Sequence, residues 1–109
     1  MEFNCTKKDG VLVVGVSGRM DAMTTTEFDA QCQSWLADGQ TRVIADLSAL
    51  EYISSAGLRS ILSAAKQLKS VGGQLVFCGL SGMVEEVFNV SGFAAMFTLH
   101  KTLDDALAG

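Results

Sequence analysis

The chain has 109 residues, 49% of them hydrophobic, and a net charge of −4 at neutral pH, which allows one well-packed domain but not two. Its eight Lys and Arg residues are scattered and form no basic stripe, so we expect no direct binding of nucleic acid. No segment has the pattern of a secretory signal and no apolar run approaches the length of a membrane span, so we expect a cytoplasmic protein without membrane insertion.

The first elements form a predicted β-hairpin. Residues 2–7 alternate weakly between apolar and polar side chains, and residues 11–16 form a strongly apolar run. Asp9-Gly10 separates the two runs, and this dipeptide favours the tight turn that joins antiparallel strands.

The next element is a predicted helix that begins near Thr25. Residues Thr24 to Glu27 have the spacing of a capping box, in which a Glu side chain returns to the N–H of the cap residue. Gly39 supplies a left-handed stop at the other end. The apolar residues of this helix recur at helical spacing, and we expect them in the core: Phe28, Cys32, Trp35 and Leu36.

A strand and a helix lie at the centre of the sequence. Residues 43–47 form an almost continuous apolar run, typical of a strand covered on both faces, after which we expect the chain to turn. From Leu58 to the Gly-Gly pair at 72–73 the apolar spacing is helical. Ser54 and Ser55 therefore lie at or just before a helix N-terminus, where a hydroxyl can accept from unpaired N–H groups. The residues of this helix expected to face the sheet are Leu58, Ile61, Leu62, Ala65 and Leu68.

The last third of the chain continues the alternation of strands and helices. It predicts a strand at 74–79, a helix from Ser81 to Gly92, a short strand at Phe97, Leu99 and Met96, and a terminal helix after Thr102. The predicted order is β-β-α-β-α-β-α-β-α, in which intervening helices favour parallel pairing. We therefore expect an α/β fold: one small domain over residues 1–109, with a mixed, mostly parallel β-sheet, an N-terminal β-hairpin and about four helices packed against it.

The residues give little support to catalysis or to a cofactor. The only histidine, His100, is far along the chain from the central serines, and the G-x-S-x-G and P-loop patterns are absent. Asp46 lacks the additional carboxylates of a receiver-like metal site, so we expect it to be a hydrogen-bonding residue that shapes a turn. The cysteines are odd in number and lie on apolar faces, so we expect buried thiols at Cys5, Cys32 and Cys78. We therefore expect a protein that is not an enzyme and uses no metal or other cofactor.

The central stretch carries a family resemblance. Residues 46–58 read D-L-S-A-L-E-Y-I-S-S-A-G-L, which resembles the signature of the STAS domains, named for sulfate transporters and anti-sigma factor antagonists. Gly18 to Asp21 resembles the G-x-x-D that follows that family's second strand, and residues 72–76 resemble its helix-to-strand joint. Residues 84–92 resemble its next short helix and cap, so the resemblance covers most of the chain.

The resemblance implies a bacterial anti-sigma factor antagonist that works by partner switching. Such a protein, when unphosphorylated, binds an anti-sigma factor that is also a serine kinase; phosphorylation ends the binding, and a serine phosphatase restores it. Motif matching implies phosphorylation at Ser55, while Ser54 stands where many antagonists have an aspartate. The residues expected at the partner-binding surface are Asp21, Ser54, Ser55, Ala56 and Gly57.

A second interpretation of the same residues stays open. In it the domain is a scaffold or small-ligand-binding STAS module that is not phosphorylated, and Ser55 is only a helix cap. The two interpretations differ in whether Ser55 ever carries a phosphate.

Overall fold

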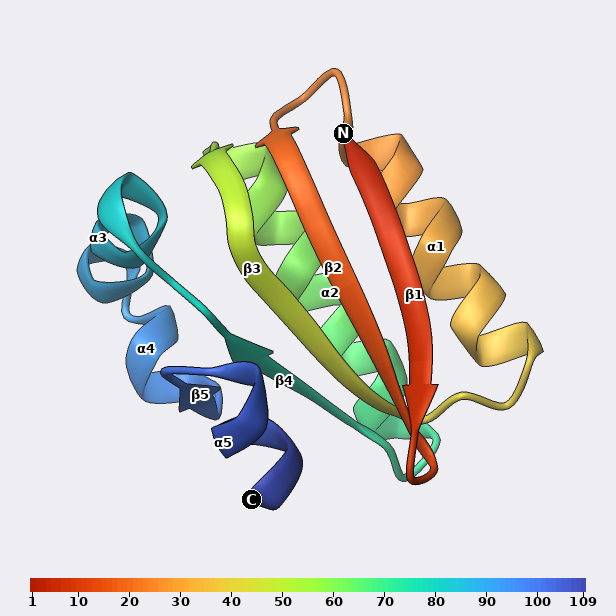
Figure 1. Ribbon diagram of the computed structural model, residues 1–109. Coiled ribbons are helices and arrows are strands. Elements are labelled where there is room, and N and C mark those ends of the chain that lie inside the picture. The colour runs from red at the N-terminus through yellow and green to blue at the C-terminus, as the bar shows by residue number, and fades with distance from the viewer.

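The computed structural model describes residues 1–109, which form one five-stranded sheet and five helices (Figure 1). The strands are β1 (Glu2–Lys8), β2 (Val11–Met20), β3 (Arg42–Ile53), β4 (Gln74–Cys78) and β5 (Leu99–His100). The helices are α1 (Thr25–Ala37), α2 (Ser55–Ser70), α3 (Gly82–Ser91), α4 (Phe93–Met96) and α5 (Leu103–Ala108). None of these helices is both long enough and apolar enough to cross a lipid bilayer.

The sheet confirms the expected α/β class. Its strands pair in the order β1-β2-β3-β4-β5, with β1 antiparallel to β2 and each later neighbouring pair parallel. Asp9 and Gly10 have positive φ values of 52° and 80°, as a two-residue type I′ turn requires, so the predicted hairpin is confirmed. The one-turn helix α4 was not predicted, and it takes up Met96, which the sequence pattern suggested for the last strand.

Helices cover both faces of the sheet. α1 and α2 lie against one face (Figure 1), where Trp35 and Ile61 belong to the main hydrophobic core. α5 packs on the other face, where Ala106 meets Ile44 and Cys78 in a second, smaller cluster. The expected core position of Trp35 is confirmed.

β2 and β3 both extend further than the sequence predicts. β3 does not turn after Leu47 but continues to Ile53, and β2 continues beside it to Met20. The register between the two strands shifts twice along this stretch, and each shift places one additional residue in β3. The core-facing side chains of β3 therefore lie three positions apart at Leu47, Leu50 and Ile53, instead of two.

The helices differ from the predictions in two details. Thr24 is the N-cap residue of α1, but its hydroxyl makes no cap bond, so the expected capping box is absent. That hydroxyl instead accepts from the N–H of Asp21 at 2.9 Å and donates to the carbonyl of Arg19 at 2.8 Å. On α2, Ile61 is completely buried but Leu62 is only half-buried, because the helix is rotated slightly from the predicted phase. The buried residues of α2 are Gly57, Ser60, Ile61, Ala64 and Leu68.

The cysteines do not share one environment. Cys32 and Cys78 are buried, but Cys5 is exposed, so the expectation of three buried thiols is wrong. The reason is that β1 is an edge strand, of which only Phe3 packs against the core. Burial, reinforced by the nearby carboxylate of Asp46, raises the pKa of the Cys78 thiol to about 11.

Candidate functional site

The ends of two strands and the start of α2 meet at one corner of the sheet. The N–H of Ser54 donates to the carbonyl of Met20 at 2.9 Å, which joins the residue after β3 to the last residue of β2. The carbonyl of Ser54 accepts from the N–H of Leu58, also at 2.9 Å. Because both backbone groups of Ser54 are bonded, α2 begins at a fixed point beyond the carboxyl ends of β2 and β3, the end of an open α/β sheet where binding sites usually lie.

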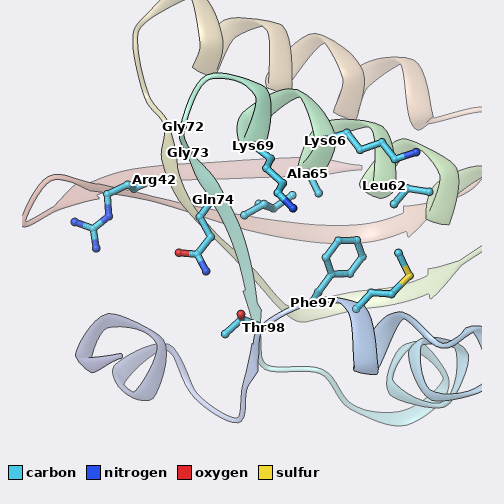
Figure 2. A pocket seen from close by; sticks show the side chains of 12 residues that line it. Arg42, Leu62, Ala65, Lys66, Lys69, Gly72, Gly73, Gln74, Phe97 and Thr98 are labelled. Atoms are coloured by element: carbon cyan, nitrogen blue, oxygen red, sulfur yellow. The ribbon is translucent and has the colours of Figure 1, made fainter.

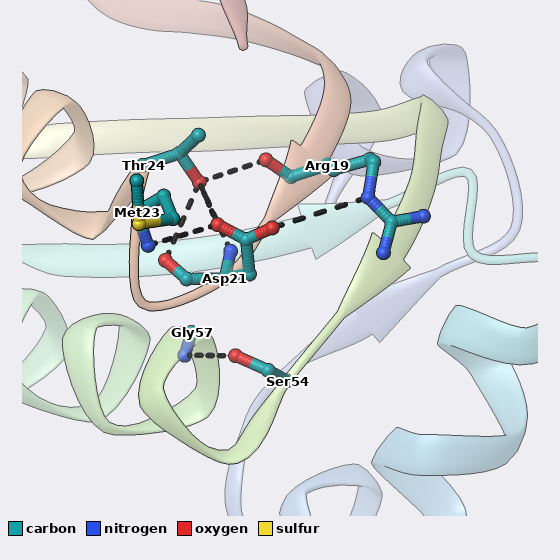
Figure 3. A network of polar contacts seen from close by, with 6 residues as sticks. All are labelled: Arg19, Asp21, Met23, Thr24, Ser54 and Gly57. Carbon is teal, nitrogen blue, oxygen red and sulfur yellow. Dashed lines mark hydrogen bonds and ion pairs between the residues drawn. The ribbon is translucent and has the colours of Figure 1, made fainter.

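The two serines have different roles at this corner. Ser54 is the N-cap residue: its backbone is extended, and its hydroxyl accepts from the N–H of Gly57 at 3.2 Å (Figure 3). Ser55 is the first residue of α2, is exposed, and makes no side-chain hydrogen bond within the protein. The interpretation of Ser55 as the helix cap is therefore wrong, because its neighbour already fills that role.

Gly57 is buried where α2 touches the end of β2. A Cβ atom at this position would lie 2.8 Å from Cγ1 of Ile53 and 2.9 Å from both Cγ and the carbonyl O of Met20. Atoms do not approach this closely in packed interiors, so a side chain at this position would force its neighbours to move. Gly57 therefore shapes the corner from beneath, while Ser55 lies on its surface and Ala56 is half-buried.

Asp21 holds the loop between β2 and α1, beside the start of α2 (Figure 3). One carboxylate oxygen accepts from the N–H of Met23 at 2.9 Å, and the other lies 3.9 Å from Nε of Arg19. The side chain of Asp21 is 28% exposed. It therefore fixes the loop and also reaches the surface, next to Met20, whose carbonyl holds Ser54.

Met23 was not identified by the sequence analysis. It lies in the loop that Asp21 holds, and it is 86% exposed. The guanidinium of Arg19 stacks over the ring of Tyr52, 4.2 Å from its centroid, and so ties together the ends of β2 and β3 beneath this loop. Met23 is therefore an exposed apolar side chain in the same loop as Asp21.

Asp46 lies within β3 and not at its end. Its carboxylate accepts from the N–H of Ser48 at 3.1 Å, at the first register shift. A Cβ atom at Gly79 would lie 2.9 Å from the same carboxylate oxygen, so the next strand end packs directly on this bulge. Asp46 does shape the backbone, as expected, but it shapes a bulge and not a turn. The His, Cys, Asp and Glu side chains form no group of three that could hold a metal ion.

Comparison with known proteins identifies the family. Residues 2–106 match the model of the STAS domain. The chain is 39% identical over 108 residues to BtrV of Bordetella bronchiseptica, named as a candidate anti-sigma factor antagonist, and the match covers 99% of this chain and 93% of that protein. It is 29% identical over 104 residues to the anti-sigma-F factor antagonist RsfB of Mycobacterium tuberculosis, covering 93% and 82% of the two chains.

The fold agrees with the sequence matches. The crystal structure of an anti-sigma factor antagonist from Mycobacterium paratuberculosis superposes with a TM-score of 0.89 at 28% identity, covering 98% of this chain and 91% of that one. Because the family model spans nearly the whole sequence and the fold matches that of a solved antagonist, the chain belongs to the STAS domain family.

Proposed function

We propose that this protein is an anti-sigma factor antagonist that binds an anti-sigma factor with serine kinase activity, and that phosphorylation of Ser55 ends the interaction. The observation that carries the proposal is the exposed, unbonded hydroxyl of Ser55 beside a different serine that already caps α2. A kinase can therefore modify Ser55 without removing a hydrogen bond that the helix needs. A serine phosphatase would return the protein to its binding state.

The free domain is well suited to carry a phosphate on Ser55. The group adds about −1.5 to −2 charges, and the N-terminus of a helix favours an anion by about 0.3 to 1 kcal/mol. Arg59 lies four residues further along α2, is exposed, and pairs with no carboxylate, so it is free to approach the phosphate. The fold should therefore survive phosphorylation, and the effect should fall on the partner.

The proposed binding surface consists of Ser55 and Ala56 at the start of α2, together with Asp21 and Met23 in the adjacent loop. Ser54 and Gly57 support it from beneath. Small or apolar side chains permit close approach of a partner, and a phosphate within such a contact must lose its hydration. Even a cost of about 3 to 4 kcal/mol weakens binding by roughly two to three orders of magnitude.

The proposal is tested by calorimetric titration with the serine-kinase anti-sigma factor encoded nearest to this protein's gene. Ser55→Ala is expected to bind like the wild type and to stay bound when the kinase is supplied with ATP. Ser55→Asp is expected to bind at least about a hundredfold more weakly while keeping its fold. Mass spectrometry of the wild type after incubation with kinase and ATP should find one phosphate, on Ser55.

Ser54→Ala is the matched control. It removes the cap bond and should lower the free energy of unfolding by about 1 kcal/mol, yet it should bind and be phosphorylated normally. Ser55→Ala, at an exposed position without a hydrogen bond, should change stability by less than about 0.5 kcal/mol. Undiminished binding by both Ser55→Asp and phosphorylated Ser55 would contradict the switch and favour an unphosphorylated scaffold.

A further inference from the structure

A groove lies along the half of α2 that is remote from Ser55. Its volume is about 600 Å³, within the range of ligand-binding sites, and it runs between α2, β4 and the segment before β5. Leu62 and Lys69 of α2 face Phe97 and Thr98 across it (Figure 2). It shares no residue with the corner around Ser55.

The groove is positively charged although the protein as a whole is negative. Arg42, Lys66 and Lys69 line it, three of the eight basic residues in the chain, and no Asp or Glu does. All three side chains are exposed, and none pairs with a carboxylate. Lys69 lies in the last turn of α2, where the helix dipole favours a cation, but the dipole does not account for the other two. The groove therefore favours an anionic occupant.

A free strand edge opens into the same groove. β5 pairs with only the last two residues of β4. The N–H of Gln74 donates to the carbonyl of Thr41 at 2.8 Å, on the β3 side of β4. The N–H of Phe77 donates to the carbonyl of Thr98 at 3.1 Å, on the β5 side. Because backbone groups alternate sides along a strand, the N–H and C=O of Leu75 also point to the β5 side, beyond the end of the β4–β5 pairing.

The unpaired backbone of Leu75 is close to the protein interior. Leu75 is only 5% exposed, and it lines the groove. These two groups belong to a free strand edge that opens into the groove, so they are available to pair with an extended segment.

We propose that this groove binds an extended, acidic segment of another protein, which adds to the free edge of β4 at Leu75. A peptide backbone supplies both the acceptor and the donor that the N–H and C=O of Leu75 require, whereas a small carboxylate supplies only acceptors. Acidic side chains of the segment meet Arg42, Lys66 and Lys69. Arg42 faces the α5 side of the sheet, as Ile44 does, whereas Leu75 faces the α2 side. One face of the segment therefore meets Arg42. The other face meets Lys66 and Lys69, and an apolar side chain on it covers the surface formed by Leu62, Leu75, Met96 and Phe97.

The test begins with a random heptapeptide library displayed on phage and selected on the wild-type protein. We expect enrichment of extended peptides that combine acidic residues with at least one apolar residue. Titration of ¹⁵N-labelled protein with an enriched, synthesised peptide should shift the amide resonances of Leu75 and Thr98 and slow hydrogen exchange at the Leu75 N–H. The Lys66→Glu/Lys69→Glu double variant should bind at least about tenfold more weakly, and wild-type affinity should fall as NaCl rises from about 0.05 to about 0.5 M.

Two matched controls separate strand addition from general attraction between charges. Lys7→Glu/Lys8→Glu changes the net charge equally at exposed residues of β1, outside the groove, and should bind like the wild type. The same peptide N-methylated at alternate amides cannot pair with Leu75 and should lose at least about tenfold in affinity.

The proposal is overturned if no acidic peptide is enriched. In that case the lysines would serve to prevent the free edge of β4 from pairing with other chains. It is also overturned if the Leu75 resonance does not move, if both double variants bind alike, or if N-methylation has no effect. Decanoate binding more tightly than the peptides would identify a small amphiphilic anion as the occupant instead.

Discussion

Gly57→Ala tests whether the close contact between α2 and the end of β2 determines the geometry of the Ser55 corner. Alanine is the better helix former, by about 0.8 to 1.0 kcal/mol in a helix interior, so propensity alone predicts a gain in stability. The backbone at Gly57 is outside the left-handed region, so an alanine suffers no conformational strain there. The outcome therefore depends on the space around the added methyl group.

That space is already filled. The methyl group would lie 2.8 Å from Ile53 and 2.9 Å from two atoms of Met20, one of which is the carbonyl O that also accepts from the N–H of Ser54. Flexible side chains can move aside, but this carbonyl can move only with the end of β2. Overpacking of this kind costs about 1 to 3 kcal/mol, and most of this range is larger than the gain from helix propensity. We expect a net loss of up to about 2 kcal/mol and a melting temperature roughly 4 to 8 °C lower for each kcal/mol lost.

The assay is urea unfolding followed by the fluorescence of Trp35, the only tryptophan, together with a thermal melt. Gly15→Ala is the matched control, because the nearest atoms to its added Cβ lie at ordinary distances of 3.6 and 3.7 Å. It should be neutral or stabilising by up to about 1 kcal/mol. A Gly57→Ala protein as stable as Gly15→Ala would refute the packing argument.

Two further predictions concern the core and the buried thiol. Ile61→Ala should lower the free energy of unfolding by about 2 to 5 kcal/mol, because Ile61 is completely buried. Leu62→Ala should lower it by clearly less, because Leu62 is only half-buried. Equal losses of the two variants in urea unfolding would contradict this orientation of α2. Because the pKa of Cys78 is raised to about 11, the unfolded chain releases this proton first, so stability should be fully present below pH 9.0 and should decline as the pH rises towards 11. Cys78→Ala should show a shallower decline over that interval, and a slope identical to the wild type would contradict the assigned shift.

Much of the fold follows from local patterns. Asp9-Gly10 allows one kind of connection between two apolar runs, and the spacing of Phe28, Cys32 and Trp35 allows only a helix. The extent of β3 was missed because its core-facing side chains lie three positions apart, which breaks the two-residue alternation expected of a strand. α4 is too short to show any period, and of the residues predicted for the last strand only Leu99 lies in β5, so the tertiary structure defines the bounds of both elements.

The candidate site was predictable in position but not in detail. The change from strand to helix places Ser54 and Ser55 at a helix start, but from sequence alone either hydroxyl could cap the helix. In the structure the backbone of Ser54 is extended, which makes Ser54 the N-cap residue. Serine and aspartate are comparably good caps, so Ser54 can fill this role as well as the aspartate that the family resemblance implies at this position. Met23 was missed because exposure in a loop leaves no periodic signal. The basic groove was missed because it joins Arg42 to side chains from α2 and the segment before β5.

The two bulges in β3 make the number of residues before α2 as important as their chemistry. Each bulge turns the strand by one position, and together they return Leu50 and Ile53 to the core side. Deleting Ser48 would remove the first bulge together with its additional residue, so the pairing with β2 would become regular and Leu50 would still face the core, two positions after Leu47. An additional residue between Leu50 and Ile53 would instead have to be absorbed by a larger bulge, or it would turn Ile53 outward. A substitution at exposed Ser48 or Glu51 leaves the count unchanged. This stretch should therefore tolerate replacements and the loss of one bulge residue, but not an inserted residue, in contrast to the turn at Gly39, where no other atom lies within 4 Å of an added Cβ.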